Sequence, residues 1–326
     1  MQSVVHNSAY VPPEWILAHG LRPWRLSPAA PRYAAASYDG CCAWAQAFAD
    51  HAAGLDDVAA IVTVTTCDQM RRAAERLMGD HRRPQPRVIS FNLPATWQTP
   101  AAQRLYRDEL RRLGRWLERC GGIAPSPDRL KEVMIGCQQQ RRDLLATLDD
   151  LTGRQRAAAL GQLHGDPTPD ESIGAASIDR RATPVALVGS AIPRYQWWVY
   201  DAIEQCGGRV ALDATDYGER GLPASFDARL MNEDPFEALA AAYFDGITHV
   251  RQRPNTGLYQ WLAAQLRVRP VRGLIVRRCL WCDLWHAEIP RLKQWSQLPV
   301  LELDLDETDA HQRALSRISA FMEMLA

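Results

Sequence analysis

Short runs of apolar, β-branched residues alternate along the chain with longer stretches in which apolar residues recur with a helical period. The clearest run is VAAIVTVT at 58–65, which has the composition of a strand buried on both faces of a parallel sheet. The clearest helical pattern is 101–120, which ends at Gly121 and Gly122. The same patterns predict further strands at 87–92, 184–190, 210–213, 271–276 and 299–303, and helices at 12–18, 70–78, 127–148, 197–206, 235–243, 256–266, 289–295 and 309–325.

The stretch 152–181 differs from the rest of the chain. It contains GDPTPDESIGAAS and has no clear apolar period after Leu163, so we interpret it as the connection between two halves. We expect an N-terminal α/β domain with a helical connection at 1–181 and a C-terminal α/β domain at 182–326. Because strands alternate with helices in both halves, each predicted sheet is parallel.

The charges of the chain balance, with 38 Lys and Arg against 38 Asp and Glu and a net charge of zero. General binding to nucleic acid or to an anionic membrane needs a basic surplus, so neither partner is expected. No apolar run approaches about 18 residues, the length of a membrane span. The first residues, MQSVVHNSAY, lack the basic and apolar regions of a signal peptide, so we expect a cytoplasmic protein.

Eight cysteines are the chemically distinctive residues of the chain. Disulfides rarely persist in the cytoplasm, which leaves buried thiols, redox chemistry or metal binding. Cys67 comes directly after the strand predicted at 58–65, and Cys282 comes just past the one at 271–276. Parallel sheets bind ligands beyond the carboxyl ends of their strands, so these positions favour one site between the domains. Only Cys279 and Cys282 have C-x-x-C spacing, and no second pair completes a zinc ribbon.

Several segments along the chain carry a family resemblance. They are YVPPE (10–14), AHGLRPWRL (18–26), CAWAQAF (42–48), TTCDQMRR (65–72), LWCD (280–283), EIPRLK (288–293), LELD (301–304) and SRISAF (316–321). Together they resemble the D components of 2-hydroxyacyl-CoA dehydratases and the related benzoyl-CoA reductase subunits. The resemblance extends over nearly the whole chain.

The resemblance implies two flavodoxin-like domains with a [4Fe-4S] cluster in the cleft between them, held by Cys42, Cys67 and Cys282. Three cysteine ligands leave one iron open, and an open iron can polarise a thioester carbonyl. The implied function is that of the iron–sulfur subunit of a lyase, which dehydrates a 2-hydroxyacyl-CoA through a one-electron, ketyl-radical step. The implied partners are an acyl-CoA substrate, a paralogous subunit or second copy of the chain, and an ATP-dependent iron–sulfur activator.

Alternatives remain open for individual cysteines. Cys41 directly precedes Cys42 and is the alternative ligand in the first segment. Cys279 can form a redox pair with Cys282 instead of acting alone. The thiols expected only to pack within helical stretches are Cys120, Cys137 and Cys206.

Charged residues near the predicted cleft also have two interpretations. Glu14 is the predicted catalytic residue, because it follows a Pro-Pro turn and can reach the open side of the cluster as an acid–base group. Its alternative role is to place a negative charge at a helix N-terminus. The pairs Arg71 with Arg72 and Arg277 with Arg278 either attract CoA phosphates or belong to solvated helix faces.

Two other functions stay open beside the dehydratase. One is a subunit of an ATP-dependent aryl-CoA reductase, in which the cluster delivers electrons to an aromatic ring. The other is a non-catalytic electron-relay or scaffold subunit of a heterodimer. A double-cubane protein is disfavoured because 245–255 carries no additional cysteine.

Overall fold

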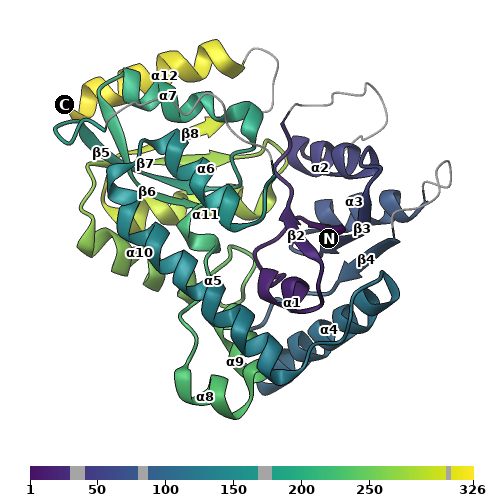
Figure 1. The fold of residues 1–326 in the computed structure, drawn as a ribbon. Helices are drawn as coiled ribbons and strands as arrows, with labels where there is room; N and C mark the ends of the chain where they lie inside the picture. The colour runs from purple at the N-terminus through teal and green to yellow at the C-terminus, as the bar shows by residue number, and fades with distance from the viewer. Residues whose placement is uncertain (30–40, 80–86, 168–177, 306–309) are drawn as a thin grey trace.

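Two parallel four-stranded sheets with flanking helices make up the protein, which we describe from a computed structural model (Figure 1). The structure describes residues 1–29, 41–79, 87–167, 178–305 and 310–326. The strand orders are β2-β1-β3-β4 in the first sheet and β6-β5-β7-β8 in the second, so the two sheets share one topology. The chain therefore folds as two α/β domains with parallel sheets, as the sequence pattern predicted, and these domains are flavodoxin-like, as the resemblance implied.

The first sheet and the helices of the N-terminal half confirm most of the predicted elements. The strands are β1 (Ser3–His6), β2 (Arg22–Arg25), β3 (Val58–Val64) and β4 (Arg87–Phe91), and the helices are α1 (Pro13–Ala18), α2 (Ala43–Ala53), α3 (Asp68–Gly79), α4 (Pro100–Arg119), α5 (Pro127–Thr147) and α6 (Gly153–Leu163). The sequence pattern did not predict β1, β2 and α2. Pro23 argued against a strand at β2, but β2 lies at the sheet edge, where proline is tolerated.

The second sheet follows the predicted strands closely. Its strands are β5 (Thr183–Gly189), β6 (Gly208–Thr215), β7 (Gly273–Arg278) and β8 (Val300–Asp304), and its half of the chain contains helices α7 (Trp198–Gln205), α8 (Ala228–Glu233), α9 (Pro235–Phe244), α10 (Thr256–Val268), α11 (Asp283–Ser296) and α12 (Ala310–Leu325). The strand β6 extends two residues past its predicted end, so the first residue after the strand is Asp216. None of the described helices is long and apolar enough to cross a membrane.

The predicted connection at 152–181 begins with the helix α6. A capping box starts this helix, because the Thr152 side chain accepts from the Gln155 N–H and the Gln155 side chain accepts from the Thr152 N–H. Residues 168–177 of the predicted connection lie outside the described residues.

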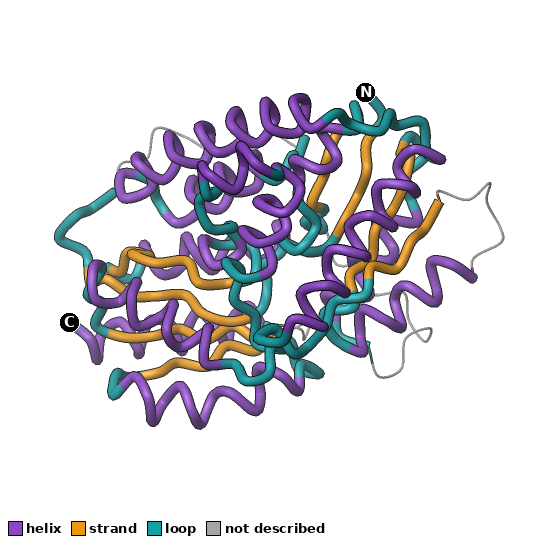
Figure 2. The backbone as a smooth tube through the Cα atoms, turned by 90° about the horizontal axis from the view of Figure 1, so that it is seen from below, coloured by secondary structure: helices purple, strands orange, loops and turns teal. Residues whose placement is uncertain are grey.

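Helices from each half of the chain pack against the sheet of the other half. Arg156 of α6 is buried and donates to the Ala211 carbonyl of β6 and to Glu219, so α6 belongs to the second domain. Tyr243 and its neighbours in α9 share one apolar core with β1, β3 and α4 of the first domain. Figure 2 shows the two sheets as separate groups of strands with helices around them. The sheets fall on either side of the predicted boundary at residue 181, whereas α6, α8 and α9 cross it.

Candidate functional site

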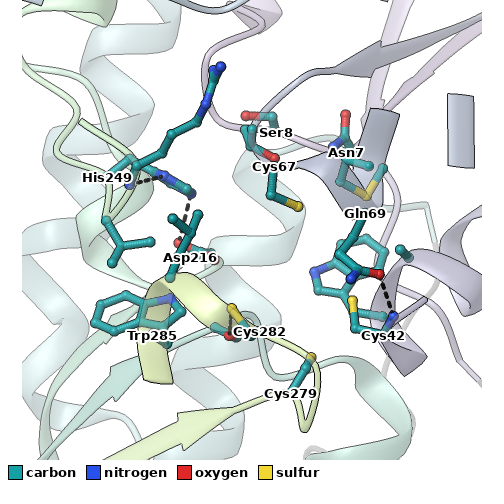
Figure 3. Close-up of a pocket in the computed structure, with 18 of the residues that line it drawn as sticks. Asn7, Ser8, Cys42, Cys67, Gln69, Asp216, His249, Cys279, Cys282 and Trp285 are labelled. Atoms are coloured by element: carbon teal, nitrogen blue, oxygen red, sulfur yellow. Dashed lines mark hydrogen bonds and ion pairs between the residues drawn. The ribbon is translucent and has the colours of Figure 1, made fainter. Parts of the chain in front are cut away.

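A cavity of about 250 Å³ lies where the carboxyl ends of the two sheets face each other. Its walls are the residues that follow β1, β3, β5, β6 and β7, together with the first turns of α2, α3 and α11 (Figure 3). Parallel sheets direct their functional loops to this edge. The residues that line this cavity come from both halves of the chain.

Four cysteines line this cavity, two from each domain. Cys42 and Cys67 come from the first domain, and Cys279 and Cys282 come from the second. Figure 3 shows the four side chains spread around the cavity, Cys67 above, Cys42 to the right and Cys279 and Cys282 below, with Asp216 and His249 to the left. The structure therefore brings together the three predicted ligands and adds Cys279 to them.

The three predicted ligands share one local geometry, since each immediately precedes a helix. Cys42 is the N-cap of α2, Cys282 is the N-cap of α11, and Cys67 directly precedes α3. The backbone N–H groups of the first turn act on each sulfur and favour its thiolate form, as they do at other helix starts. At Cys42 and Cys282 they do so without a capping hydrogen bond of ordinary geometry.

Despite these helix starts, the free thiols hold their protons at neutral pH. The Cys279 side chain, followed by burial, raises the pKa of Cys42 well above its usual value. Burial raises the pKa of Cys67, and it raises the pKa of Cys282 to about 12. The nearby Cys279 sulfur adds to the shift at all three positions. A metal centre that takes these sulfurs as thiolates must therefore displace their protons.

The structure distinguishes between the two adjacent cysteines of the first segment. Cys42 lines the cavity and Cys41 does not, although both are buried. Gln69 accepts a hydrogen bond from the Cys42 backbone N–H at 2.7 Å, and Gln46 donates to the Cys41 carbonyl at 2.7 Å. These bonds fix the peptide so that the second thiol of the pair is directed to the cavity.

Opposite the cysteines, Asp216 forms the centre of a charged network. Arg220 bonds its carboxylate and also donates to the Gly189 carbonyl at 3.2 Å, which links the ends of β5 and β6. The His249 Nε2 lies 3.6 Å from the same carboxylate. Burial acts to raise the pKa of Asp216, but Arg220 and His249 outweigh it and lower the pKa. Burial lowers the pKa of His249 to about 4, so this ring is neutral at pH 7.

Two buried side chains on the cavity wall carry N–H donors that have no partner in the structure. Arg25 donates through Nη2 to the Asp216 carbonyl at 2.6 Å, while its Nε and Nη1 atoms have no hydrogen bond. The indole Nε1 of Trp285 is also buried without a partner. Unpaired buried donors are costly, and the Arg25 guanidinium is partly compensated by the Tyr217 ring, whose centroid lies 4.0 Å away.

The predicted catalytic residue, Glu14, lies away from this cavity. Its carboxylate is fully buried, bonds Arg141 of α5 and accepts from the Tyr243 hydroxyl of α9 at 2.6 Å. Glu14 is not one of the described residues that line the cavity. Its position corrects the expectation that it reaches the open side of a cluster, because the Pro-Pro turn directs α1 toward α5 and α9. The contacts assign it to a buried ion pair.

The arginine pairs expected near CoA phosphates separate in the structure. Arg277 is fully buried and donates to Gln196 at 2.7 Å, so it cannot reach a solvent-borne phosphate. Arg278 pairs with Asp304 at 2.8 Å. Arg71 and Arg72 are exposed on α3 near the cavity rim. Of the two pairs, the one on α3 keeps the predicted role open.

Several residues of the site were not predicted from the sequence. Asp216 escaped notice because the predicted strand 210–213 ended short of the true tip of β6. Arg25 is the last residue of β2, a strand that the sequence pattern did not predict. His249 lies in a loop that carries no recognisable motif. A longer extrapolation of the apolar run at β6 would have placed Asp216 at a strand end. The sequence gives no comparable signal for His249.

Comparison with protein families yields one match over almost the whole chain. The family model described as 2-hydroxyglutaryl-CoA dehydratase, D-component, matches residues 8–165 and 169–325. A search of curated proteins finds no significant match. The two matched segments contain all four cavity cysteines and every strand of the two sheets except β1, which lies before residue 8.

Proposed function

The chain belongs to the 2-hydroxyglutaryl-CoA dehydratase D-component family, and from this premise we propose that it is the iron–sulfur component of a 2-hydroxyacyl-CoA dehydratase-type enzyme. In this proposal Cys42, Cys67 and Cys282 hold a [4Fe-4S] cluster in the cavity between the domains. The cluster supplies a single low-potential electron for loss of water from an acyl-CoA thioester.

The convergence of cysteines from both sheets carries the proposal. Thiolates are the ligands that iron–sulfur clusters require, and here they come from helix starts whose N–H groups favour the anion. Among the described residues, no three His, Cys, Asp or Glu side chains are close enough to share one metal ion. A cubane presents separate irons at its corners, so its ligands stand further apart than those of a single ion. The cysteines of the cavity are therefore compatible with the spacing of a cluster.

The residues around the cysteines support a reducing centre because they help to exclude water and to fix the cavity walls. Trp44 packs edge-to-face on Phe48 and approaches Tyr217 of the other domain, with ring centroids 5.8 Å apart, and so helps to exclude water. Arg25 and Trp285 also line the cavity. Asn7 holds the loop beyond β1 against β3 by accepting from the Val64 N–H at 2.7 Å. These contacts keep the cavity walls fixed and partly dry.

Anaerobic purification tests the proposal directly. Iron and sulfide content and the electron paramagnetic resonance spectrum of the reduced protein should indicate about four iron and four sulfide per chain. Cys67→Ala should lose most of both, while Cys206→Ala, a change at a thiol outside the cavity, should keep them. Iron-free protein that folds normally under strict anaerobiosis would contradict the proposal.

The finer assignment of the reaction needs partners and substrate. The proposed partners are a paralogous subunit or second copy, an ATP-dependent iron–sulfur activator and an acyl-CoA. Loss of water from a 2-hydroxyacyl-CoA with activator and ATP supports the lyase, whereas reduction of an aryl-CoA supports the reductase alternative.

A specific observation favours a second candidate, an electron-relay subunit. Cys279 lines the same cavity as the three predicted ligands. A relay needs no open iron, so an additional thiolate is compatible with electron transfer but competes with a substrate oxygen.

A further inference from the structure

The two domains differ in the loops that join their third strands to the cysteine before the next helix, which are residues 65–66 in the first domain and residues 279–281 in the second. β3 and β7 are the third strands of their sheets, and Thr65 and Cys279 are the first residues after them. The Thr65 hydroxyl bonds within its own sheet, accepting from the Leu93 N–H at 3.1 Å, and Thr65 does not line the cavity. Cys279 lines the cavity. The second domain thus places two sulfurs where the first domain places one at this loop.

Cys279 contacts the site across the domain boundary. Its side chain is the largest cause of the raised pKa of Cys42, through a direct side-chain hydrogen bond. It also acts on Cys67 and Cys282. Cys279 is buried in the same cluster of side chains as Cys42, and Cys67 and Cys282 pack against that cluster.

The surroundings of Cys279 are polar as well as buried. Arg277 is fully buried and donates through Nη1 to the Cys279 sulfur at 2.9 Å. The Cys279 carbonyl accepts from the Cys282 N–H at 2.9 Å, closing a tight turn between the two cysteines. A guanidinium that bonds a sulfur is typical of a thiolate site, and C-x-x-C turns recur among cubane ligands.

We propose that Cys279 is a fourth protein ligand, so that cysteines from both domains, two from each, close all four irons of the cluster. This inference rests on the proposed function and deepens it. With a cluster bound, the Cys279 thiol would release its proton to water, and its sulfur would replace the water molecule on the fourth iron. No electron is transferred.

A closed cluster changes the role of this chain within the proposed enzyme. An iron with four sulfur ligands offers no site to a thioester oxygen, so this subunit passes electrons onward rather than binding substrate on iron. Under this arrangement the substrate-binding cluster belongs to a partner subunit.

The experiment uses anaerobically loaded, ⁵⁷Fe-enriched full-length protein and follows the iron sites by Mössbauer spectroscopy. We expect wild type to give irons that all have sulfur-only coordination, and Cys279→Ala to give one distinct iron in four. After mild oxidation with ferricyanide, wild type should keep about four iron per cluster, and Cys279→Ala should fall to about three. Cys206→Ala is the matched control and should behave as wild type.

Other outcomes separate the two proposals. A wild-type spectrum with one distinct iron, or equal iron loss in wild type and Cys279→Ala, would overturn the fourth ligand and leave the proposed function standing. A disulfide between Cys42 and Cys279 in loaded protein, detected by mass spectrometry, would overturn it as well. Absence of iron from all folded variants would overturn the proposed function itself. Because the wild-type spectrum is decisive, misfolding of a variant does not obscure the answer.

Discussion

Cys67 and Cys282 occupy the same place in the two domains, each preceding the helix that follows the third strand of its sheet. The strands β3 and β7 each pair with the first strand of their own domain, β1 and β5. The two thiols therefore approach one cavity from opposite sheets. Any group bound by both sulfurs joins the domains.

Removing a bound cluster should loosen both walls of the cavity. A ligand that binds only the folded state stabilises it, so loaded protein should melt at a higher temperature than chelator-stripped protein. Hydrogen exchange should slow on loading in 42–45, 67–70 and 282–285, the three helix starts. Cys67→Ala should show no such gain, and Cys206→Ala should show all of it. Slowing confined to one domain would argue against a shared cluster.

Replacing Glu14 by Gln should destabilise the fold without altering the cluster site. The change leaves the buried Arg141 facing a neutral amide, which costs about 3 kcal/mol of the free energy of unfolding. The exposed pair Arg129 with Glu132 supplies the control, since Glu132→Gln should change stability by less than about 0.5 kcal/mol. Urea denaturation measures both. Unchanged stability together with lost activity would restore the catalytic role of Glu14.

Gly189 ends β5 in a conformation that only glycine adopts easily, with φ at +124°. A Cβ atom there would lie 1.9 Å from the Arg277 carbonyl oxygen. Gly189→Ala should therefore lower the free energy of unfolding by at least about 3 kcal/mol. Gly136→Ala, at an open position of α5, should be neutral or stabilising by about 0.5–1 kcal/mol. Comparable denaturation curves for the two variants would refute this account of the β5 end.

Stability should fall as the pH drops from about 6.5 to about 4. The pKa of His249 is lowered by burial to about 4, so over this window the unfolded chain binds a proton that the folded protein does not. The share of His249 reaches about 3 kcal/mol at the acid end. His6 and His164 act in the same direction, because burial lowers their pKa too.

The test of the pH effect compares two histidine variants. Urea denaturation at several pH values between 5 and 7 should give a shallower dependence for His249→Asn than for wild type. His311→Asn, at an exposed ring, should keep the wild-type slope. Equal slopes in all three proteins would mean that His249 is protonated in the folded state.

The sequence predicted the two sheets better than it predicted the residues of the cavity wall. A run such as 58–65 predicts its strand from local composition alone. The end of that strand then gives the position of Cys67. The positions of Cys279, Arg25 and His249 depend on how the second sheet faces the first, which no local pattern encodes. The direction of α1, which carries Glu14, likewise depends on its packing against α5 and α9 and not on a local pattern.

Some of what was missed had a readable signal. Thr152 and Gln155 form a Ser/Thr-x-x-Glu/Gln capping sequence, which indicates the start of α6 inside the stretch interpreted as a connection. For β2 the local signal was misleading, because Pro23 disfavours a central strand and only the edge position of β2 permits it.

The exchange of α6, α8 and α9 between the halves makes the two domains interdependent in folding. A polypeptide ending near residue 181 would lack the α9 side chains that complete its own apolar core, and the complementary fragment would lack α6. Separate expression of the halves should therefore give insoluble fragments that recover structure only when mixed. The same interlocking restrains hinge motion between the domains. Small and large reagents should therefore differ sharply in how readily they reach the cysteines of the cavity.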